Sequence, residues 1–356
     1  MENSIITYNI LNFKNKIAAF DLDHTLIQPK NNKIFPKDKD DWEWKCNILD
    51  VLTLLDKNDW SIVIFTNQLG VKRGTITKDD LLFKFKNIHI SSKLNITFIA
   101  SINNNYFRKP FPGMWEYIFK KKTFHSVFYC GDAFDPNHTK LKASDLKFAL
   151  NLNIPFIKNT TIFMDGFTIN KLDGLYEKLD IQNFITLTSI KRDVVKGEKI
   201  KLIQFIKKYK YLFIISPPSS GKTTFCKKYL TSHQFLRLSK DDYSTPVKYL
   251  KDINIKSTNK LVFDNTNYTE KSRNKIIEVL ISENVSIDQI GYIYRDIKKQ
   301  DSIYLNNYRC FITKGLEKLL PEVVIHKYYK SLEIPDKNCL KLSSWVDNKN
   351  IKDFII

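Results

Sequence analysis

The chain has 356 residues, and its 57 Lys and Arg against 38 Asp and Glu give a net charge of +19. A typical domain of about 150 residues predicts two domains, and 43% hydrophobic residues supply two full-sized cores, which excludes a mainly disordered chain. The positive charge favours a phosphate-rich partner, either nucleic acid or an anionic membrane face, although a lysine-rich surface that serves solubility is an equally simple reason.

Short apolar runs separated by longer mixed segments predict strands that alternate with helices. The expected strands are 17–22, 61–65, 96–100 and 126–130 in the first half, and 211–216, 260–263 and 290–294 in the second. Between the two series lies a basic stretch, 191–210, which predicts an amphipathic linker helix or a nucleic-acid contact. We therefore expect two successive α/β domains with mainly parallel sheets, 1–185 and 186–356.

Paired carboxylates follow the first expected strand. Asp21 and Asp23 stand two residues apart in the pattern DxDxT, where one carboxylate can attack a phosphorus atom and the other can exchange a proton with the leaving oxygen. A cation must offset the repulsion between carboxylate and phosphate, and Mg²⁺ is a hard, oxygen-liganded ion that suits this role. An acidic turn at the end of a strand is the alternative, so the motif alone does not decide.

Three later segments add polar residues at the same edge of the predicted sheet. Thr66 follows the second strand and can bond a phosphate oxygen, Lys109 offers a cation for the phosphoryl charge, and Asp132 follows the fourth strand. Each would be an ordinary turn residue by itself. Together with the DxDxT motif they indicate a site for phosphoryl transfer.

This order of motifs resembles the haloacid dehalogenase superfamily of phosphotransferases. The segments IFTNQ at 64–68, RKPFPGMW at 108–115, YCGDAFD at 129–135 and SDLKFALNLNIPF at 144–156 are similar to the phosphatase domain of the polynucleotide kinase/phosphatase family. The resemblance covers about residues 15–165 and implies a 3′-phosphatase. The roles that it implies are nucleophile for Asp21, general acid/base for Asp23, phosphate ligand for Thr66, Asn67 and Lys109, and Mg²⁺ ligand for Asp21, the Asp23 carbonyl, Asp132 and Asp145, with Asp135 as the alternative to Asp145.

A phosphate-binding loop follows the expected strand 211–216. The sequence SPPSSGKTT at 216–224 places a tight loop before the start of a helix, so that backbone N–H groups, the Lys222 ammonium and the Thr223 hydroxyl would hold the phosphates and Mg²⁺ of ATP. The loop departs from the pattern GxxxxGK[ST] at Ser216, where the pattern has a glycine. The expected nucleotide-binding residues are Ser216, Ser219, Ser220, Gly221, Lys222, Thr223 and Thr224.

Polar residues after two further strands complete this second site. Asp241 and Asp242 can accept a proton from an attacking hydroxyl, unless they only begin a helix, and DNTN at 264–267 ends another strand. These segments resemble the 5′-hydroxyl kinase domain of the same family. That resemblance implies Asp241 as the proton acceptor and Arg309, or in its place Arg295, as the cation for the transferring phosphate.

The two resemblances imply a haloacid-dehalogenase-like phosphatase domain followed by a P-loop kinase domain, in a bifunctional enzyme of DNA repair that uses Mg²⁺ and ATP. It would prepare DNA ends for a ligase, with RNA left open as a substrate. Because the nucleophile already stands at position 21, we expect the form without an amino-terminal phosphopeptide-binding domain. Two alternatives stay open: a small-molecule phosphatase fused to a metabolite kinase, and a phosphatase whose decayed kinase half serves as a nucleic-acid-binding scaffold.

The cysteines and the amino-terminal sequence predict where in the cell the protein is located. Five scattered cysteines form no CxxC pair, which argues against disulfides and a zinc cluster. The chain shows no signal peptide and no apolar run of about 18 residues. We therefore expect a soluble intracellular protein without a membrane span.

Overall fold

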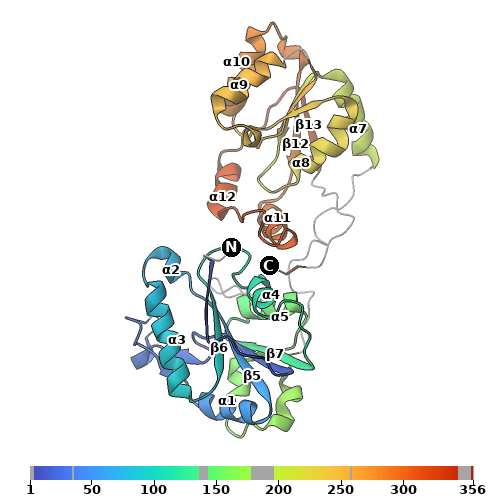
Figure 1. Ribbon diagram of the computed structural model, residues 1–356. Coiled ribbons are helices and arrows are strands. Elements are labelled where there is room, and N and C mark those ends of the chain that lie inside the picture. The colour runs from blue at the N-terminus through green and yellow to red at the C-terminus, as the bar shows by residue number, and fades with distance from the viewer. Residues whose placement is uncertain are drawn as a thin grey trace. The chain divides into compact units, whose positions relative to one another are not determined.

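The computed structural model describes residues 4–33, 36–135, 143–177, 196–256, 259–343 and 354–355. The chain forms two compact units, the first made of residues 1–186, 310–318 and 353–356 and the second of residues 187–309 and 319–352. Each unit is a sheet covered by helices (Figure 1). The domain boundary predicted near residue 185 falls outside the described residues and stays a prediction.

The sheet of the first unit has six strands in the order β1-β6-β5-β2-β7-β8. Only β1 is antiparallel to its neighbour, and the other described pairs are parallel. Since β2 pairs with β5 on one side and with β7 on the other, the carboxyl end of β2 is the switch point where ligands bind in such sheets. The strands are β1 (Ile5–Tyr8), β2 (Lys16–Phe20), β5 (Trp60–Asn67), β6 (Ile96–Ser101), β7 (Ser126–Gly131) and β8 (Phe156–Lys158), and a small hairpin pairs β3 (Ile27–Gln28) with β4 (Glu43–Trp44).

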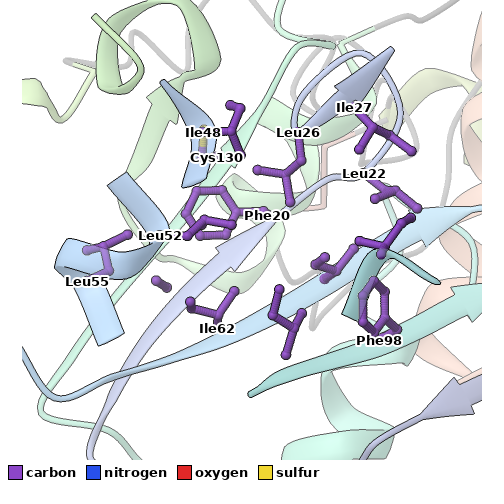
Figure 2. Packing of buried hydrophobic residues seen from close by; sticks show 14 of the residues in the cluster. Phe20, Leu22, Leu26, Ile27, Ile48, Leu52, Leu55, Ile62, Phe98 and Cys130 are labelled. Carbon is purple, nitrogen blue, oxygen red and sulfur yellow. The ribbon is translucent and has the colours of Figure 1, made fainter. Parts of the chain in front are cut away.

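Both faces of this sheet are buried, which explains why its strands read as continuous apolar runs. Ala18 and Phe20 pack in one hydrophobic cluster with α1 and α3, whereas Ile17 and Ala19 pack in a second cluster with α4 and α5. Figure 2 shows the first cluster, in which Phe20 lies near Leu52. The helices are α1 (Ile48–Lys57), α2 (Gly70–Arg73), α3 (Lys78–Ser92), α4 (Gly113–Phe119), α5 (Ser144–Leu152) and α6 (Asn159–Ile162).

The sheet of the second unit has five parallel strands in the order β10-β11-β9-β12-β13. Here β9 holds the central place, with β11 on one side and β12 on the other, so its carboxyl end is again a switch point. The expected α/β fold with two mainly parallel sheets is confirmed. The strands are β9 (Tyr211–Ile215), β10 (Leu236–Leu238), β11 (Leu261–Phe263), β12 (Ile290–Asp296) and β13 (Cys339–Ser343).

Helices also cover both faces of the second sheet. One cluster of buried residues joins α7 and α8 to the sheet, and another joins α9 and α10. Of the basic stretch 191–210, residues 191–195 lie outside the described ranges, and most of the rest forms α7, which buries Leu202 and Ile206. The helices in this half of the chain are α7 (Lys196–Lys208), α8 (Lys222–Phe225), which continues as a π-helical turn (Cys226–Leu230), α9 (Pro246–Ile255), α10 (Glu270–Ser282), α11 (Lys299–Ile312) and α12 (Glu322–Lys330).

The last described residues of the chain pack within the first unit. The Phe354 ring stacks on Phe111 with 5.2 Å between ring centroids and on Phe311 with 4.3 Å. The Asn151 side chain donates to the Ile355 carbonyl and accepts from its N–H. Among the described residues, every helix is too short or too polar to serve as a membrane span.

Candidate active sites

Three aspartates meet at the carboxyl edge of the first sheet. Asp21 follows β2, Asp132 follows β7, and Asp145 lies in the first turn of α5. One carboxylate oxygen of each lies within 4.8 Å of the others. Gly131 permits this approach, because a Cβ there would lie 2.5 Å from Asp145 Cγ. Three carboxylates at this spacing are the kind of oxygen donor set that holds a hard divalent cation.

A buried lysine lies against the aspartates. The Nζ atom of Lys109 is 2.5 Å from Asp21 Oδ1 and 2.7 Å from Asp145 Oδ1, and it donates to the Tyr129 hydroxyl at 2.8 Å. Asn67 fixes the backbone of this lysine, because its side-chain amide accepts from the Lys109 N–H and donates to the Lys109 carbonyl. Asn67 is expected from the sequence as a phosphate ligand. In the structure, both the nitrogen and the oxygen of its side-chain amide bond to the backbone of Lys109.

The aspartate cluster carries more negative than positive charge. Burial raises the pKa of Asp21 well above its usual range, and Asp145 and Asp132 add to this rise while Lys109 opposes it. Burial and the neighbouring Asp145 likewise raise the pKa of Asp132. A divalent cation would supply the missing positive charge, so these residues fit a Mg²⁺ site. Asp135, the sequence alternative to Asp145, is exposed and lies outside this cluster of described residues.

The carboxylate of Asp23 is held on both of its oxygens. Lys84 Nζ lies 2.9 Å from Oδ1, and Gln68 Nε2 donates to Oδ2 at 2.6 Å. Burial by itself would raise the pKa of Asp23, but the charge of Lys84 and the hydrogen bonds from Lys84 and Gln68 lower it below its usual value. Gln68 also donates to Thr66 Oγ1 at 2.8 Å. The acid/base candidate and the phosphate-binding candidate therefore share one neighbour.

Sequence reasoning missed several of these neighbours. Thr25, the last residue of DxDxT, donates to Asp132 Oδ1 at 3.1 Å, and the Tyr129 hydroxyl donates to Asp145 Oδ1 at 3.1 Å. Both stand inside segments that the motifs had already marked, so they could have been found. Lys84 lies in the middle of α3, and no spacing in the sequence signals its contact.

The second site begins where β9 ends. Ser219 and Gly221 take left-handed φ values of 59° and 75°, whereas Ser216 does not. A serine can therefore stand where the pattern GxxxxGK[ST] has its first glycine, because that position does not need glycine's conformational freedom. The hydroxyls of Ser216 and Ser220 lie 2.8 Å apart and join the two ends of the loop.

Lys222 and Thr223 begin the helix that follows this loop. Burial lowers the pKa of Lys222 to about 8, with Asp264 opposing the shift, and Lys222 Nζ donates to the Pro217 carbonyl at 2.8 Å. Thr223 Oγ1 donates to Asp264 Oδ2 at 2.8 Å. Arg237, which sequence reasoning missed, donates from Nε to the same oxygen at 2.6 Å. The carboxylate of Asp264, just after β11, is thus hydrogen-bonded to Thr223, which directly follows the phosphate-binding loop.

Side chains from β12 and α11 support the loop. Arg295 and Ser302 each donate to a carbonyl of the loop at 2.9 Å, and Ser219 Oγ donates to Asn306 Oδ1 at 3.1 Å. Burial lowers the pKa of Arg295 to about 10, and the residue is only 2% exposed. Arg295, the sequence alternative to Arg309, is therefore buried against the loop.

The remaining expected residues belong to the same unit. Asp241 is exposed in a short 3₁₀ turn after β10, and its charge slightly opposes the fall in the pKa of Lys222 that burial causes. Arg309 is half-buried on α11, about one helical turn beyond Asn306, which contacts the loop. Thr224 is exposed on α8. The structure therefore places the expected kinase residues on the elements around one loop.

Residues 16–163 match the family model described as polynucleotide kinase 3 phosphatase. A polynucleotide 3′-phosphatase from Saccharomyces cerevisiae is 32% identical over 209 residues, covering 41% of this chain and 87% of the relative. The chain belongs to the polynucleotide kinase 3 phosphatase family. This family membership confirms the resemblance seen in the sequence.

Similarity to one family relative extends through both units. A bifunctional polynucleotide phosphatase/kinase from Schizosaccharomyces pombe is 29% identical over 347 residues, which cover 93% of this chain and 79% of the relative. Among solved structures, the D,D-heptose 1.7-bisphosphate phosphatase from B. bronchiseptica, complexed with magnesium and phosphate, covers 40% of this chain and 79% of its own, with 21% identity and a TM-score of 0.34.

Proposed function

We propose that the chain is a bifunctional enzyme that heals nucleic-acid ends. Its first unit removes a 3′-phosphate, and its second unit uses ATP to phosphorylate a 5′-hydroxyl. The observation that carries the proposal is that one chain holds both the Lys109–aspartate cluster and the Lys222–Thr223 loop, along a span aligned with a bifunctional relative. Two phosphate-handling sites also give the net charge of +19 a common cause.

The first site is suited to a two-step phosphatase reaction. Asp21 attacks the phosphorus atom, and the bond to the 3′-oxygen breaks. Asp23, which is ionised before substrate binds, takes up a proton when the negative charge of the bound phosphate raises its pKa, and it gives this proton to the leaving oxygen. The phosphoryl group is then bound to Asp21 as an acyl phosphate. Asp23 accepts a proton from the attacking water, and the hydrolysis releases inorganic phosphate and regenerates Asp21. Lys109 and the Thr66 hydroxyl would offset and bind the charged phosphoryl oxygens.

The charge excess of this site supports a requirement for Mg²⁺. Asp21, Asp132, Asp145 and the main-chain carbonyl of Asp23 would hold the ion, whose positive charge lets a carboxylate approach a phosphate dianion. Burial, together with the neighbouring Asp145, raises the pKa of Asp21 and Asp132 despite the opposing charge of Lys109, and a second positive charge would favour their ionised forms. We therefore expect a chelator to abolish the phosphatase activity.

The second site is suited to transfer of the γ-phosphoryl group of ATP. The loop amides and Lys222 would hold the phosphates, and Thr223 would hold the nucleotide's Mg²⁺. Asp241 would accept the proton of the attacking 5′-hydroxyl, and Arg309 would offset charge on the transferring group. The bond between Thr223 and Asp264 and the support from Arg295 favour a working loop over a decayed one.

The proposed function names a substrate, DNA ends, and a cellular location, an intracellular compartment. The substrates are DNA ends, and the healed ends carry the 5′-phosphate and 3′-hydroxyl that a ligase joins. The five cysteines all lie within the described residues and form no disulfide there, and three of them are buried, which suits a reducing intracellular compartment.

An oligonucleotide with a 3′-phosphate and a 5′-hydroxyl tests the proposal directly. With Mg²⁺ alone it should lose the 3′-phosphate, and with ATP added it should gain a 5′-phosphate, both measured by mass. Both reactions should weaken as salt rises, because binding depends on phosphate contacts. Turnover of small phosphate esters without change at either end would favour the metabolite enzyme, and loss of the 3′-phosphate alone would favour a decayed kinase half.

A further inference from the structure

The carboxylate of the acid/base candidate Asp23 is hydrogen-bonded by two side chains from different parts of the fold. Lys84 reaches Oδ1 from the middle of α3, with only 11% of its side chain exposed. Gln68 reaches Oδ2 from the segment just after β5 and is 9% exposed. The start of α3 is fixed by a reciprocal pair of hydrogen bonds between Thr77 and Asp80. The ammonium of Lys84 is therefore presented by a rigid element.

The orientation of the Gln68 amide follows from its neighbours. Its nitrogen lies 2.6 Å from Asp23 Oδ2 and 2.8 Å from Thr66 Oγ1. An ionised carboxylate only accepts hydrogen bonds, so the amide must turn its NH₂ group toward Asp23. The same NH₂ group then makes Thr66 Oγ1 an acceptor. The hydroxyl proton of Thr66 is left to donate elsewhere, and an incoming phosphate oxygen would accept it.

We propose that Lys84 and Gln68 are positioning residues of the phosphatase reaction. Lys84 and Gln68 together hold the Asp23 side chain in one rotamer, from which it can give a proton to the leaving 3′-oxygen once the charge of the bound phosphate has caused it to take up that proton. Gln68 also sets the Thr66 hydroxyl as a donor to the phosphoryl group. This inference rests on the proposed phosphatase function and adds two residues that the motifs do not assign.

The proposal separates proton transfer from phosphate binding. Proton transfer requires the acid to lie within hydrogen-bond reach of the leaving oxygen, so a carboxylate free to rotate loses much of its effect. An alkoxide leaving group, such as a nucleic-acid 3′-oxygen, needs that proton, whereas the phenolate of p-nitrophenyl phosphate leaves without it. Loss of Lys84 should therefore slow the first substrate more than the second.

The experiment compares Lys84→Met, Lys84→Arg and Gln68→Met with the wild type on both substrates. Lys86→Met is the matched control, because Lys86 is exposed on the same helix. For Lys84→Met we expect kcat on the 3′-phosphate oligonucleotide to fall at least about tenfold, with KM nearly unchanged and p-nitrophenyl phosphate turnover reduced less than about threefold. Lys84→Arg should recover most of the lost kcat. Gln68→Met should lower kcat and also raise KM, because Thr66 loses its orientation.

Three outcomes would overturn the inference. An equal loss on both substrates would show that Lys84 acts on the fold or on hydrolysis of the acyl phosphate that both substrates share, and not on proton transfer to the leaving group. A change confined to KM would show that Lys84 contacts the nucleic acid instead. Wild-type rates in Lys84→Met and Gln68→Met would show that Asp23 needs neither neighbour. Thermal unfolding followed by tryptophan fluorescence reports whether the first unit of each variant is folded, because four of the five tryptophans lie in that unit. Failure of the proposed function is distinct, because the wild type itself would then leave the 3′-phosphate in place.

Discussion

Replacing Lys109 by methionine should strongly destabilise the first unit in the absence of metal. Lys109 is 4% exposed, and its ammonium lies between Asp21 and Asp145, which are 8% and 1% exposed. Removing one partner of a buried ion pair costs about 3–5 kcal/mol, because the other charge stays buried without its counter-ion. For a unit of about 200 residues, that loss corresponds to a fall in Tm of about 6–20 °C.

Thermal unfolding followed by tryptophan fluorescence would measure this change. Four of the five tryptophans, Trp42, Trp44, Trp60 and Trp115, lie in the first unit, so the signal reports mainly on it. A divalent cation on the three carboxylates would replace part of the missing charge. Mg²⁺ should therefore raise the Tm of Lys109→Met by more than it raises the Tm of the wild type. Kinase activity would show that the second unit is unaffected.

Two results would refute this reasoning. If metal-free Lys109→Met unfolded within about 1 °C of the wild type, the ion pairs would not be a net support of the buried carboxylates. If Mg²⁺ stabilised both proteins equally, the lysine and the metal would not serve the same cluster.

Three further predictions follow from contacts elsewhere. Gly131→Ala should abolish phosphatase activity and Mg²⁺ binding by calorimetry while sparing the kinase, because the new Cβ would meet Asp145; retained metal binding would contradict this. ATP binding at about pH 8 and above should take up a proton at Lys222, whose pKa is about 8 in the free protein, so affinity is nearly full at about pH 7, about half of that at about pH 8 and about tenfold lower at about pH 9; an affinity independent of pH would show that Lys222 is not near the phosphates. Phe354→Ala should destabilise the first unit by about 3–5 kcal/mol in chemical unfolding, because the ring is fully buried against Phe111; an unchanged transition would show that this packing does not form.

The strands and the residues at their carboxyl ends could be predicted from sequence. The run 211–215 is buried at every position, so its apolar character is continuous and unambiguous. Asp21, Thr66 and Asp132 were placed together because parallel strands end at one edge of their sheet. The antiparallel edge strand β1 was missed, since four residues of mixed burial leave a weak pattern.

Contacts that depend on how helices pack could not be predicted. The contact between Lys84 and Asp23 joins residues 61 positions apart, and its existence depends on the place and rotation of α3. The sequence also leaves open whether Asp135 or Asp145 is the further Mg²⁺ ligand, because spacing along the chain does not show which carboxylate lies near the carboxyl end of the strand. The close contact of Asp145 with Gly131 explains why Asp145 lies in the cluster. The role of Asn67 as a phosphate ligand stays a prediction, because a motif marks a position and leaves the direction of the side chain unspecified, and the amide of Asn67 hydrogen-bonds the backbone of Lys109.

The central claim is that two independent phosphate-handling sites share one chain. It is tested most directly by one oligonucleotide with a 3′-phosphate and a 5′-hydroxyl, incubated with ATP and Mg²⁺ and with the wild type, Asp21→Asn or Lys222→Ala. We predict that Asp21→Asn leaves the 3′-phosphate in place but still phosphorylates the 5′ end, and that Lys222→Ala does the reverse. Both activities surviving in both variants, or both lost together in folded variants, would contradict the account.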